Sequence, residues 1–342
     1  MKSYESSLVL PDGTIRFGIY DKPISRINYL DYDFRTPMGR KISLAEKWAG
    51  FNQFQYFGII SDDLLFGCAI SNIRFIGVAF MYLYQPSTQR LIEYSYKQPL
   101  ALGTRFSQSA THGTSRFSGK KVNVEMTSVL NPAEKHLKVQ LGEELQADVF
   151  FSEAEPPFHP MSICTRAGYN GWVYAQKVAG VAVQGKLSCA LGEYDFAETE
   201  AYAHHDFSAG FMRRETFWNW ACFSGALSDG TRLGLNVSCG VNETSYTENC
   251  LWVNGELIKV DLVRFDFDRN DIHSLWNIHS NDGQVDLIFY PEGFHAEKVN
   301  AVLAASNFKQ FFGRFSGELN LRNQTFEITD MPGFVEDHYA KW

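Results

Sequence analysis

The chain has 342 residues, of which 45% are hydrophobic and 20% are charged, and its formal net charge is −8 at pH 7. This composition excludes a disordered chain, and the length favours two domains of roughly 100–200 residues each. The negative charge argues against nucleic acid as a partner, because phosphate binding needs a basic face.

The first predicted element is a helix in the segment 43–60, "SLAEKWAGFNQFQYFGII". Ser43 and Glu46 have the spacing of a capping box, and Leu44, Trp48 and Phe51 fall on one helical face. Gly58 can end such a helix. A second, weaker helix is predicted in "HAEKVNAVLAASNFKQFFG", with a break at Gly313.

Strands are the dominant prediction. Apolar residues alternate with polar ones in "KVNVEM", "RLGLNVSC" and "GELNL", which is typical of half-buried strands. Asp-Gly or Asn-Gly turns occur at 228–231, 253–256 and 281–284, about every 25–30 residues. This spacing predicts long strands paired into a large antiparallel barrel, and it does not suit alternating strands and helices.

The best candidate for a domain boundary is "FFSEAEPPFHPMS". Pro156, Pro157 and Pro160 lack backbone N–H donors and interrupt a β-ladder. We therefore expect two domains, residues 1–155 and residues 156–342, each rich in β-structure.

The six cysteines are scattered without a C-x-x-C pair, which favours buried reduced thiols over disulfides or zinc ligands. The N-terminus lacks the apolar core of a signal peptide, and no stretch is long enough for a membrane-spanning helix. A cytoplasmic location is the corresponding expectation.

The densest cluster of titratable and aromatic residues is the segment 202–240. On a strand, Glu215 and Asn219 share one face, and the pair Trp218 and Trp220 shares the other. One interpretation directs the face with Glu215 and Asn219 into a ligand cavity. The alternative leaves that face in solvent and makes the tryptophans core.

Two further clusters carry polar groups among apolar ones. Glu248 and Asn249 precede an apolar strand, at a pocket mouth or in a hydrogen-bonded loop. In the C-terminal "GFVEDHYAKW", Asp337 stands between Glu336 and His338, and a carboxylate beside an imidazole can share a proton. The alternative is that these groups pair with arginines such as Arg213 or Arg214, and we expect residues 331–342 to form the closing edge of the second barrel.

Several functional signatures are absent from the sequence. There is no phosphate-binding loop, no G-x-G-x-x-G, no G-x-S-x-G and no H-E-x-x-H. Nucleotide-driven, hydride-transfer and serine-hydrolase chemistry are therefore poorly supported. No metal and no cofactor are expected.

The motifs "HHDFSAG", "RRETFWNWACFSGALSDGTRLGLNVSCG", "VDLIFYPEG", "FKQFFGRFSGEL" and "GFVEDHYAKW" resemble the bacterial domain-of-unknown-function family 2804. More distantly, "HDFSAG" followed by the Trp-rich strand and an Asp-Gly turn resembles the lipocalin-like superfamily of carotenoid hydratases, tocopherol cyclases, kievitone-type hydratases and fungal pericyclases. The resemblance implies an all-β fold of two lipocalin-like antiparallel barrels or curled sheets, with one or two short helices and a pocket for a hydrophobic small molecule. The resemblance implies a functional role for His205 and Asp206 alone.

The function expected from the sequence is binding of an isoprenoid- or polyketide-like molecule, with cofactor-free hydration, cyclisation or isomerisation by acid–base chemistry. A non-catalytic lipid carrier and a glycan-directed protein are the alternatives. The candidate catalytic residues are His205, Asp206, Glu215, Asp337 and His338. The candidate ligand-binding residues are Trp218, Asn219, Trp220, Asn236, Glu248, Asn249 and Trp252.

Overall fold

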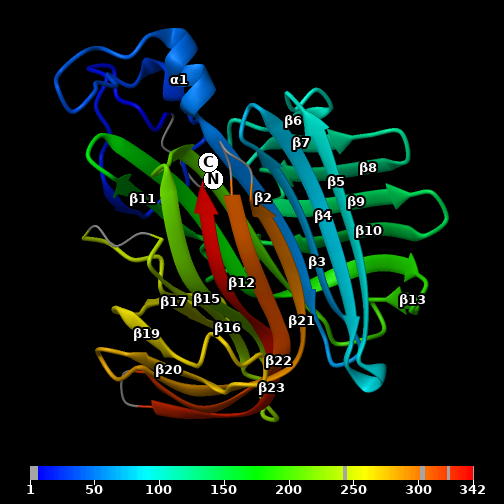
Figure 1. Cartoon of the computed structure of the whole chain (residues 1–342). Helices are drawn as coiled ribbons and strands as arrows, with labels where there is room; N and C mark the ends of the chain where they lie inside the picture. Colours follow the sequence, from blue (N-terminus) through cyan, green and yellow to red (C-terminus); the bar gives the residue numbers. More distant parts are fainter. Residues whose placement is uncertain (1–6, 242–244, 301–304, 322–323, 342) are drawn as a thin grey trace.

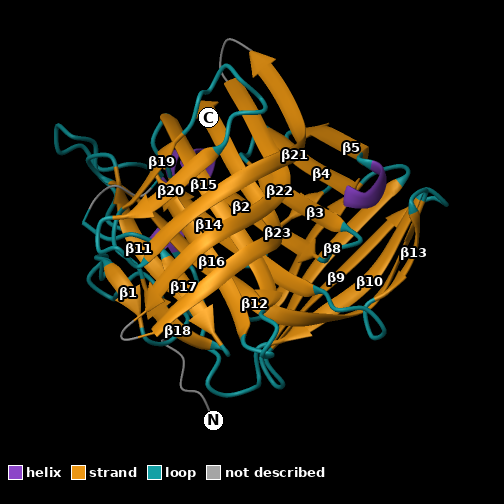
Figure 2. Ribbon diagram, turned by 90° about the horizontal axis from the view of Figure 1, so that it is seen from below, coloured by secondary structure: helices purple, strands orange, loops and turns teal. Residues whose placement is uncertain are grey.

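The computed structural model describes residues 7–241, 245–300, 305–321 and 324–341. These residues form a nearly closed barrel-like sheet of 14 strands and a half-barrel sheet of nine (Figures 1 and 2). The helices are α1 (Leu44–Gly50) and the short 3-10 helices η1 (Tyr29–Asp31) and η2 (Pro86–Thr88). The predicted all-β class is thus confirmed. No helix in the described part of the chain has the length and apolar character needed to cross a membrane.

The first sheet is antiparallel, with the strand order β5-β4-β3-β2-β14-β12-β10-β9-β8-β7-β6. Off this path, β11 pairs with β1 and β12, and β13 pairs with β12. Its strands are β1 (Gly18–Tyr20), β2 (Asn52–Ile60), β3 (Leu65–Asn72), β4 (Ile76–Gln85), β5 (Arg90–Pro99), β6 (Thr104–Arg105), β7 (Gly113–Ser118), β8 (Val122–Val129), β9 (Glu134–Leu141), β10 (Leu145–Ser152), β11 (Met161–Ala167), β12 (Gly171–Cys189), β13 (Gly192–Asp195) and β14 (Tyr202–Phe211).

The second sheet is also antiparallel, with the order β18-β17-β16-β15-β23-β22-β21-β20-β19. Its strands are β15 (Glu215–Ala226), β16 (Arg232–Cys239), β17 (Cys250–Val253), β18 (Glu256–Lys259), β19 (Val263–Asp266), β20 (Trp276–Ser280), β21 (Val285–Asn300), β22 (Ala305–Leu321) and β23 (Gln324–Lys341). The C-terminal strand β23 lies between β15 and β22. The expectation that it forms the closing edge of a barrel is therefore wrong.

The chain passes from the first sheet to the second between β14 and β15, after Phe211. The proline-rich segment proposed as a domain boundary lies between β10 and β11, both of which belong to the first sheet. A division of the chain by sheets therefore falls near residue 212, and the boundary at 155 stays a prediction.

The helix predicted from Ser43 begins as expected but is short. The capping box is present, because the Ser43 hydroxyl accepts from the Glu46 N–H and the Glu46 carboxylate accepts from the Ser43 N–H. The helix ends at Gly50, and the following residues form β2. The second predicted helix is wrong: its described residues belong to the long hairpin of β21 and β22. Residues 301–304 of that segment lie outside the described residues.

The predicted turns are confirmed as hairpin connections. The turn 228–231 joins β15 to β16, 281–284 joins β20 to β21, and Asn254-Gly255 joins β17 to β18. Asn254 and Gly255 both have positive φ, as the tight turn requires. All six cysteines are free thiols, and four of them are buried.

The two sheets pack against each other through one face of each. A single hydrophobic cluster contains residues from the lumen of the first sheet and residues such as Trp220, Phe312 and Phe334 from the second. A separate cluster fills the other face of the second sheet. On the face of the first sheet that points away from its lumen, the centroid of the Tyr82 ring lies 5.2 Å from that of Phe312 and 6.0 Å from that of Phe334, both on the second sheet. This outer face therefore meets the second sheet.

Candidate functional site between the two sheets

A layer of polar and aromatic side chains lies where the sheets meet. Strand pairing aligns Lys177 on β12, Asp206 on β14 and Tyr56 on β2 in one row across the first sheet. Neighbouring residues of a strand point to opposite faces, so these three side chains share the outer face. In the next row on this face, His204 pairs with Gly58 and Gly67 with Tyr82.

Two glycines make room for the rings of this second row. A Cβ on Gly58 would lie 2.0 Å from Cε1 of His204, and a Cβ on Gly67 would lie 2.1 Å from Cζ of Tyr82. The Tyr56 ring lies 5.0 Å from the His204 ring, and its hydroxyl forms a hydrogen bond with that of Tyr82. The glycines thus allow an imidazole and two phenols to lie together over the sheet.

Burial fixes the protonation of these groups. Desolvation raises the pKa of Tyr56 and Tyr82 well above 10 and lowers the pKa of His204 to about 3. Neither ring nitrogen of His204 has a hydrogen-bond partner among the described residues. At neutral pH the site therefore contains two protonated phenols and an uncharged imidazole.

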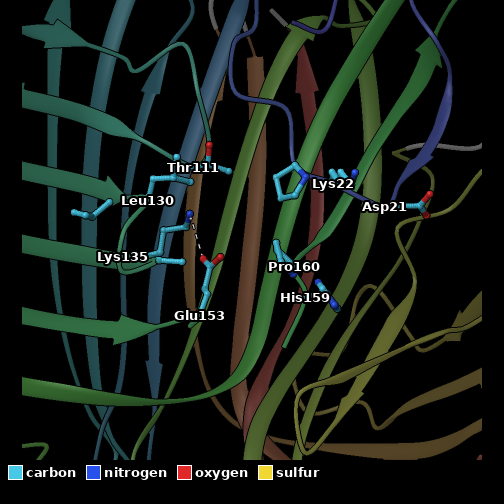
Figure 3. A pocket seen from close by; sticks show the side chains of 11 residues that line it. Asp21, Lys22, Thr111, Leu130, Lys135, Glu153, His159 and Pro160 are labelled. Atoms are coloured by element: carbon cyan, nitrogen blue, oxygen red, sulfur yellow. Dashed lines mark ion pairs between the residues drawn. The ribbon is translucent and has the colours of Figure 1, made fainter. Parts of the chain in front are cut away.

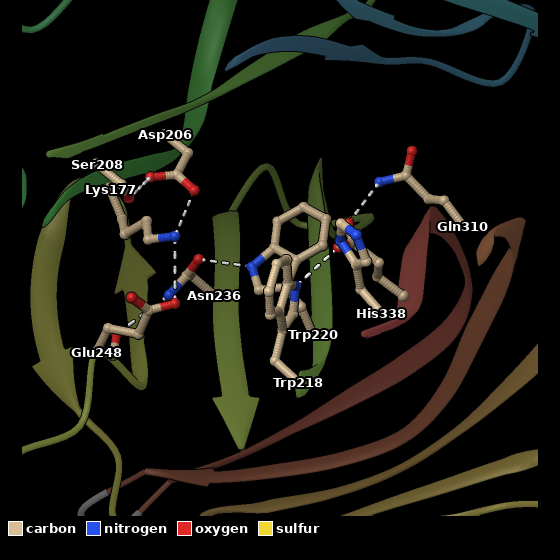
Figure 4. A network of polar contacts seen from close by, with 10 residues as sticks. Lys177, Asp206, Ser208, Trp218, Trp220, Asn236, Glu248, Gln310 and His338 are labelled. Atoms are coloured by element: carbon tan, nitrogen blue, oxygen red, sulfur yellow. Dashed lines mark hydrogen bonds and ion pairs between the residues drawn. The ribbon is translucent and has the colours of Figure 1, made fainter. Parts of the chain in front are cut away.

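The second sheet contributes the facing surface from β15, β22 and β23. Pairing places Glu336 beside Trp220 and Gln310, and places His338 beside Trp218. We call the following set the inter-sheet cluster: Tyr56, Tyr82, Lys177, His204, Asp206, Trp218, Trp220, Asn236, Glu248, Gln310, Glu336 and His338. Figure 4 shows most of its members.

One half of the cluster is an ion-pair triad around Lys177. Its Nζ atom lies 2.6 Å from Oδ2 of Asp206 and 3.2 Å from Oε1 of Glu248 (Figure 4). Burial alone would lower the pKa of the Lys177 ammonium, but the two carboxylates outweigh it and raise this pKa. Ser208 donates to Asp206, and Glu248 belongs to the loop before β17. The triad therefore links the two sheets.

The other half is built around Glu336. The Trp218 indole N–H donates to Oε1 of Glu336 at 2.7 Å, and Gln310 donates to Oε2 at 3.4 Å. Nδ1 of His338 lies 3.4 Å from the same carboxylate, within ion-pair range but without hydrogen-bond geometry. On its other side, the His338 ring forms a hydrogen bond with the Ser306 hydroxyl. A carboxylate and an imidazole are thus held side by side between aromatic rings.

Two further hydrogen bonds connect Trp220 to Glu248 through Asn236. The Trp220 indole N–H donates to Oδ1 of Asn236 at 2.9 Å, and the Asn236 amide donates to the Glu248 carbonyl. Trp218 and Trp220 therefore stand between the triad and the Glu336 group, as Figure 4 shows.

The cluster is closed at one end and reaches the surface at the other. Toward the ends of β2 and β4, the outer-face residues Ile60 and Tyr84 are buried. Toward the starts of these strands, Phe54 and Val78 are half-buried, and so is Ser208 on β14. Ligand access to the cluster is therefore expected from the end where β2 and β4 begin.

The lumen of the first sheet is a different environment. Its buried side chains form a packed core, with a pocket of about 150 Å³ at one end that is lined in part by Lys135, Glu153 and His159 (Figure 3). The Lys135 ammonium lies 3.2 Å from the Glu153 carboxylate. This volume is below the roughly 300–1,000 Å³ of typical ligand pockets. We prefer the inter-sheet cluster because polar side chains of both sheets converge in it.

The structure brings together some of the residues expected from the sequence. Six of them belong to the inter-sheet cluster: Asp206, Trp218, Trp220, Asn236, Glu248 and His338. His205 faces the lumen of the first sheet instead, where its Nε2 lies 3.0 Å from Nε2 of Gln55. Burial, followed by the Lys135 charge, holds the pKa of His205 well below 6.5.

The remaining expected residues lie elsewhere. Glu215 is exposed and pairs with Lys341, and Asn219 donates to Asp337 on the other face of the second sheet. Asp337 pairs with an arginine, Arg269, which is not one of the two arginines given as examples from the sequence.

Asn249 and Trp252 are hydrogen-bonded to the backbone. Asn249 accepts from the Ser238 N–H and donates to the Asp261 carbonyl, which makes it a loop staple. The Trp252 indole donates to the carbonyl of His159.

Sequence reasoning missed Lys177, the tyrosine pair and Gln310 as site residues, and it left Glu336 and His204 out of the candidate set. Lys177 could have been found as the single charge in the apolar run "WVYAQKVAGVAV". For Glu336, strand alternation would have separated it and His338 from Asp337. The tyrosines carry no sequence signal that distinguishes them from core residues. No group of three or more potential ligand side chains that could hold a metal ion occurs in the described ranges.

Comparisons with known proteins add the fold relatives and the family. No curated protein matches the sequence. The structure is similar to CghA, with a TM-score of 0.60 at 10% identity over 99% of this chain and 97% of CghA, and to CghA with Sch210972, with a TM-score of 0.59 at 8% identity and the same coverage. Kievitone hydratase from Nectria haematococca is more distant, with a TM-score of 0.45 at 8% identity over 85% of this chain and 88% of that chain. At these identities the similarity to CghA concerns the fold alone, and it agrees with the expected all-β architecture. The profile of DUF2804, described as a domain of unknown function, matches residues 2–342, and the chain therefore belongs to the DUF2804 family.

Proposed function

We propose that the chain binds a small apolar molecule between its two sheets and converts it by proton transfer, without a cofactor, in a hydration, cyclisation or isomerisation. The observation that carries this proposal is the pairing of Glu336 with His338 at the partly exposed end of an otherwise buried aromatic layer. Apolar walls with a few convergent polar groups are typical of small-molecule sites.

Glu336 and His338 are the residues to which we assign the proton transfer. One of the two groups, in its protonated form, donates a proton to an alkene carbon or a carbonyl oxygen of the ligand. The other group acts as the base and removes a proton from a neighbouring C–H bond or from an added water. Transfer of the removed proton from the base to the acid restores both residues, so no external oxidant or reductant is needed. The Trp218 indole N–H holds the Glu336 carboxylate in place for this exchange.

The tyrosine pair supplies the orienting group. Burial keeps both phenols of Tyr56 and Tyr82 protonated, and one hydroxyl donates to the other, which leaves the second O–H to donate a hydrogen bond to an oxygen of the ligand. Asp206 is the second acid–base candidate, but Lys177 and Ser208 already bind its carboxylate. We therefore assign Asp206 to positioning and charge balance.

A non-catalytic carrier is the second candidate function. The observation that favours it is the triad, because Lys177, Asp206 and Glu248 satisfy one another and connect the sheets without any ligand. No observation favours the glycan-directed alternative. Among the described tryptophans Trp48 alone is exposed, and it lies on α1, outside the inter-sheet cluster.

The fold comparison supports a ligand role in general terms. CghA, which shares this fold, has also been crystallised with Sch210972. The nature of the molecule bound by the present chain is left to experiment.

Two steps test the proposal. Mass spectrometry of the purified protein identifies the apolar molecule that it retains, and this molecule and its analogues are then assayed for binding and turnover. We expect Glu336→Gln to lower turnover by about a hundredfold or more while binding changes little, because general acid–base groups contribute roughly 10²–10⁴-fold.

Asp337→Asn is the matched control, since Asp337 is adjacent in sequence but points to the opposite face. Turnover should be unchanged in this variant. Wild-type turnover in Glu336→Gln would remove the assigned mechanism and leave the carrier.

A further inference from the structure

Exposed apolar side chains gather at the end of the first sheet where the inter-sheet cluster reaches the surface. They are Leu44 and Trp48 of α1, Phe75 of the turn between β3 and β4, and Leu100 and Leu102 of the turn between β5 and β6. Phe75, Leu100 and Leu102 are 67%, 66% and 83% exposed. We call these five residues the apolar tips.

The tips form one continuous surface. Leu44 and Trp48 are four residues apart and therefore share a face of α1. The guanidinium of Arg74 lies 5.4 Å from the Trp48 ring, which brings the neighbouring Phe75 close to α1. The N–H of Leu100 donates to the carbonyl of Phe75 at 2.8 Å. Three segments that are distant in sequence thus meet at one end of the molecule.

This end is the open end of the inter-sheet cluster. α1 leads directly into β2, and Phe75 directly precedes β4. The half-buried Phe54 and Val78 lie two residues inside these strands, at roughly 3.3 Å per residue. Figure 1 shows α1 and β6 at the same, upper end of the molecule.

Uncompensated positive charge accompanies the tips. A surface hollow of about 530 Å³ beside Leu102 is lined by Leu102, Gly103, Arg105, Thr114, Arg116 and Ser118. Arg105 and Arg116 are directly paired across β6 and β7, an arrangement of like charges that is destabilising unless an anion lies between them. Arg116 binds Glu125, whereas Arg105 has no ion-pair or hydrogen-bond partner within the described part of the chain.

We propose that the apolar tips and the Arg105/Arg116 hollow dock the protein on an anionic phospholipid surface. The tips would enter the interface, where exposed Trp, Phe and Leu side chains are favoured, and the hollow would receive a lipid phosphate. The net charge of −8 opposes this contact only weakly at physiological salt, because charges more than about 8 Å from the surface are then largely screened. Docking in this orientation would present the open end of the cluster to the bilayer, from which an apolar molecule can enter.

Vesicle flotation tests the docking. The purified full chain is mixed with vesicles of phosphatidylcholine alone or of phosphatidylcholine with phosphatidylglycerol, at low and at physiological salt. We expect binding to the mixed vesicles, weakened by salt, and little binding to phosphatidylcholine alone. The double variant Phe75→Asp/Leu102→Asp should lower the bound fraction about tenfold or more, and Arg105→Glu should lower it at low salt.

The matched control is the double variant Leu262→Asp/Leu275→Asp, which introduces the same two charges at exposed leucines next to β19 and β20 of the second sheet. It should float like the wild type. Failure of the wild type to bind mixed vesicles, or undiminished binding by the double variant, would overturn the proposal. Self-association that the double variant abolishes, measured by size-exclusion chromatography, would also overturn it and assign the tips to a protein interface. These outcomes do not depend on Glu336 or on turnover, so docking and the proposed function can fail separately.

Discussion

Strand β14 has one face toward the second sheet and the other toward the lumen of the first sheet, and the two faces carry different side chains. Its residues His204 and Asp206 face the second sheet, where they meet Lys177 and a tyrosine pair. Its residues His205 and Phe207 face the lumen. Strand β23 divides in the same way, with Glu336 and His338 toward the first sheet and Asp337 away from it.

This contrast shows why adjacent titratable residues in a strand cannot be treated as one site. The lumen of the first sheet is lined mainly by apolar side chains, and its polar groups pair with residues of the same sheet or its loops, as His205 does with Gln55 and Lys135 with Glu153. The surface between the sheets receives side chains from two independent sheets, and polar groups can meet partners across it. The inter-sheet cluster is therefore where the chain brings proton donors and acceptors together.

The largest expected effect comes from removing the cation of the triad. Lys177→Met leaves the buried carboxylates of Asp206 and Glu248 without their counter-charge, and loss of one partner of a buried pair costs about 3–5 kcal/mol. Chemical denaturation measures the free energy of unfolding. The control Lys186→Met removes the ammonium of a side chain that is 79% exposed, and it should change the free energy of unfolding far less. Equal losses in the two variants would contradict the triad's role.

The next effect is pH dependence from the buried His204. Because its pKa is about 3 in the folded state and near 6.5 when unfolded, the unfolded state binds more protons between these values. Stability is therefore fully present above pH 6.5 and falls as the pH decreases toward 3, by up to about 1.4 kcal/mol per pH unit for this group. His204→Phe should lower the slope of the unfolding free energy between pH 6.5 and pH 4 by up to this amount, and the slope that remains includes His205, whose pKa is also held below 6.5. An unchanged slope would show that the imidazole is protonated in the folded protein.

A smaller effect tests the close packing over the glycines. Gly58→Ala places a methyl group within the His204 ring and should destabilise by about 1–3 kcal/mol. In Gly50→Ala the new Cβ has its nearest contact at 3.9 Å, so this control should leave the thermal midpoint nearly unchanged. Tolerance of Gly58→Ala would mean that the imidazole does not cover β2.

The smallest effect is expected on the far face of the second sheet. The Arg269 side chain is 62% exposed and pairs with Asp337 at 3.0 Å, and such pairs contribute about 0–1 kcal/mol. Arg269→Gln should therefore change the denaturation midpoint only slightly and should not alter ligand binding. A large loss of binding would place the functional surface on the Asp337 side.

Much of the fold could be predicted from the sequence, because the patterns that specify strands, turns and the start of the helix involve residues that are close together in the chain. The alternation in 122–129 and the Asn-Gly and Asp-Gly turns act within a few residues, and so does the capping box at Ser43. The sequence predicts too long a helix because Phe51 continues its apolar face, although pairing with β3 and β14 makes the next residues a strand. In the segment 295–313, the Ala, Glu and Lys residues favour a helix locally, and pairing in the β21–β22 hairpin overrides that preference.

The site was less predictable, because its contacts are not local. Lys177 lies 29 residues from Asp206, and Trp218 lies 118 residues from Glu336. Strand alternation predicts that Glu336 and Asp337 point to opposite faces of their strand. No local pattern shows which of these faces packs against the other sheet. The order of strands decides that, and it places β14 between β2 and β12.

The central claim is that the ligand lies between the two sheets, and photoaffinity labelling tests it most directly. A diazirine analogue of the co-purifying apolar molecule is bound and irradiated, and the labelled residues are mapped by mass spectrometry with and without competing ligand. We predict competable labelling around Phe54, around Trp218–Trp220 and around Phe308–Phe312. Competable labelling confined to the lumen strands β8–β10 would contradict the claim.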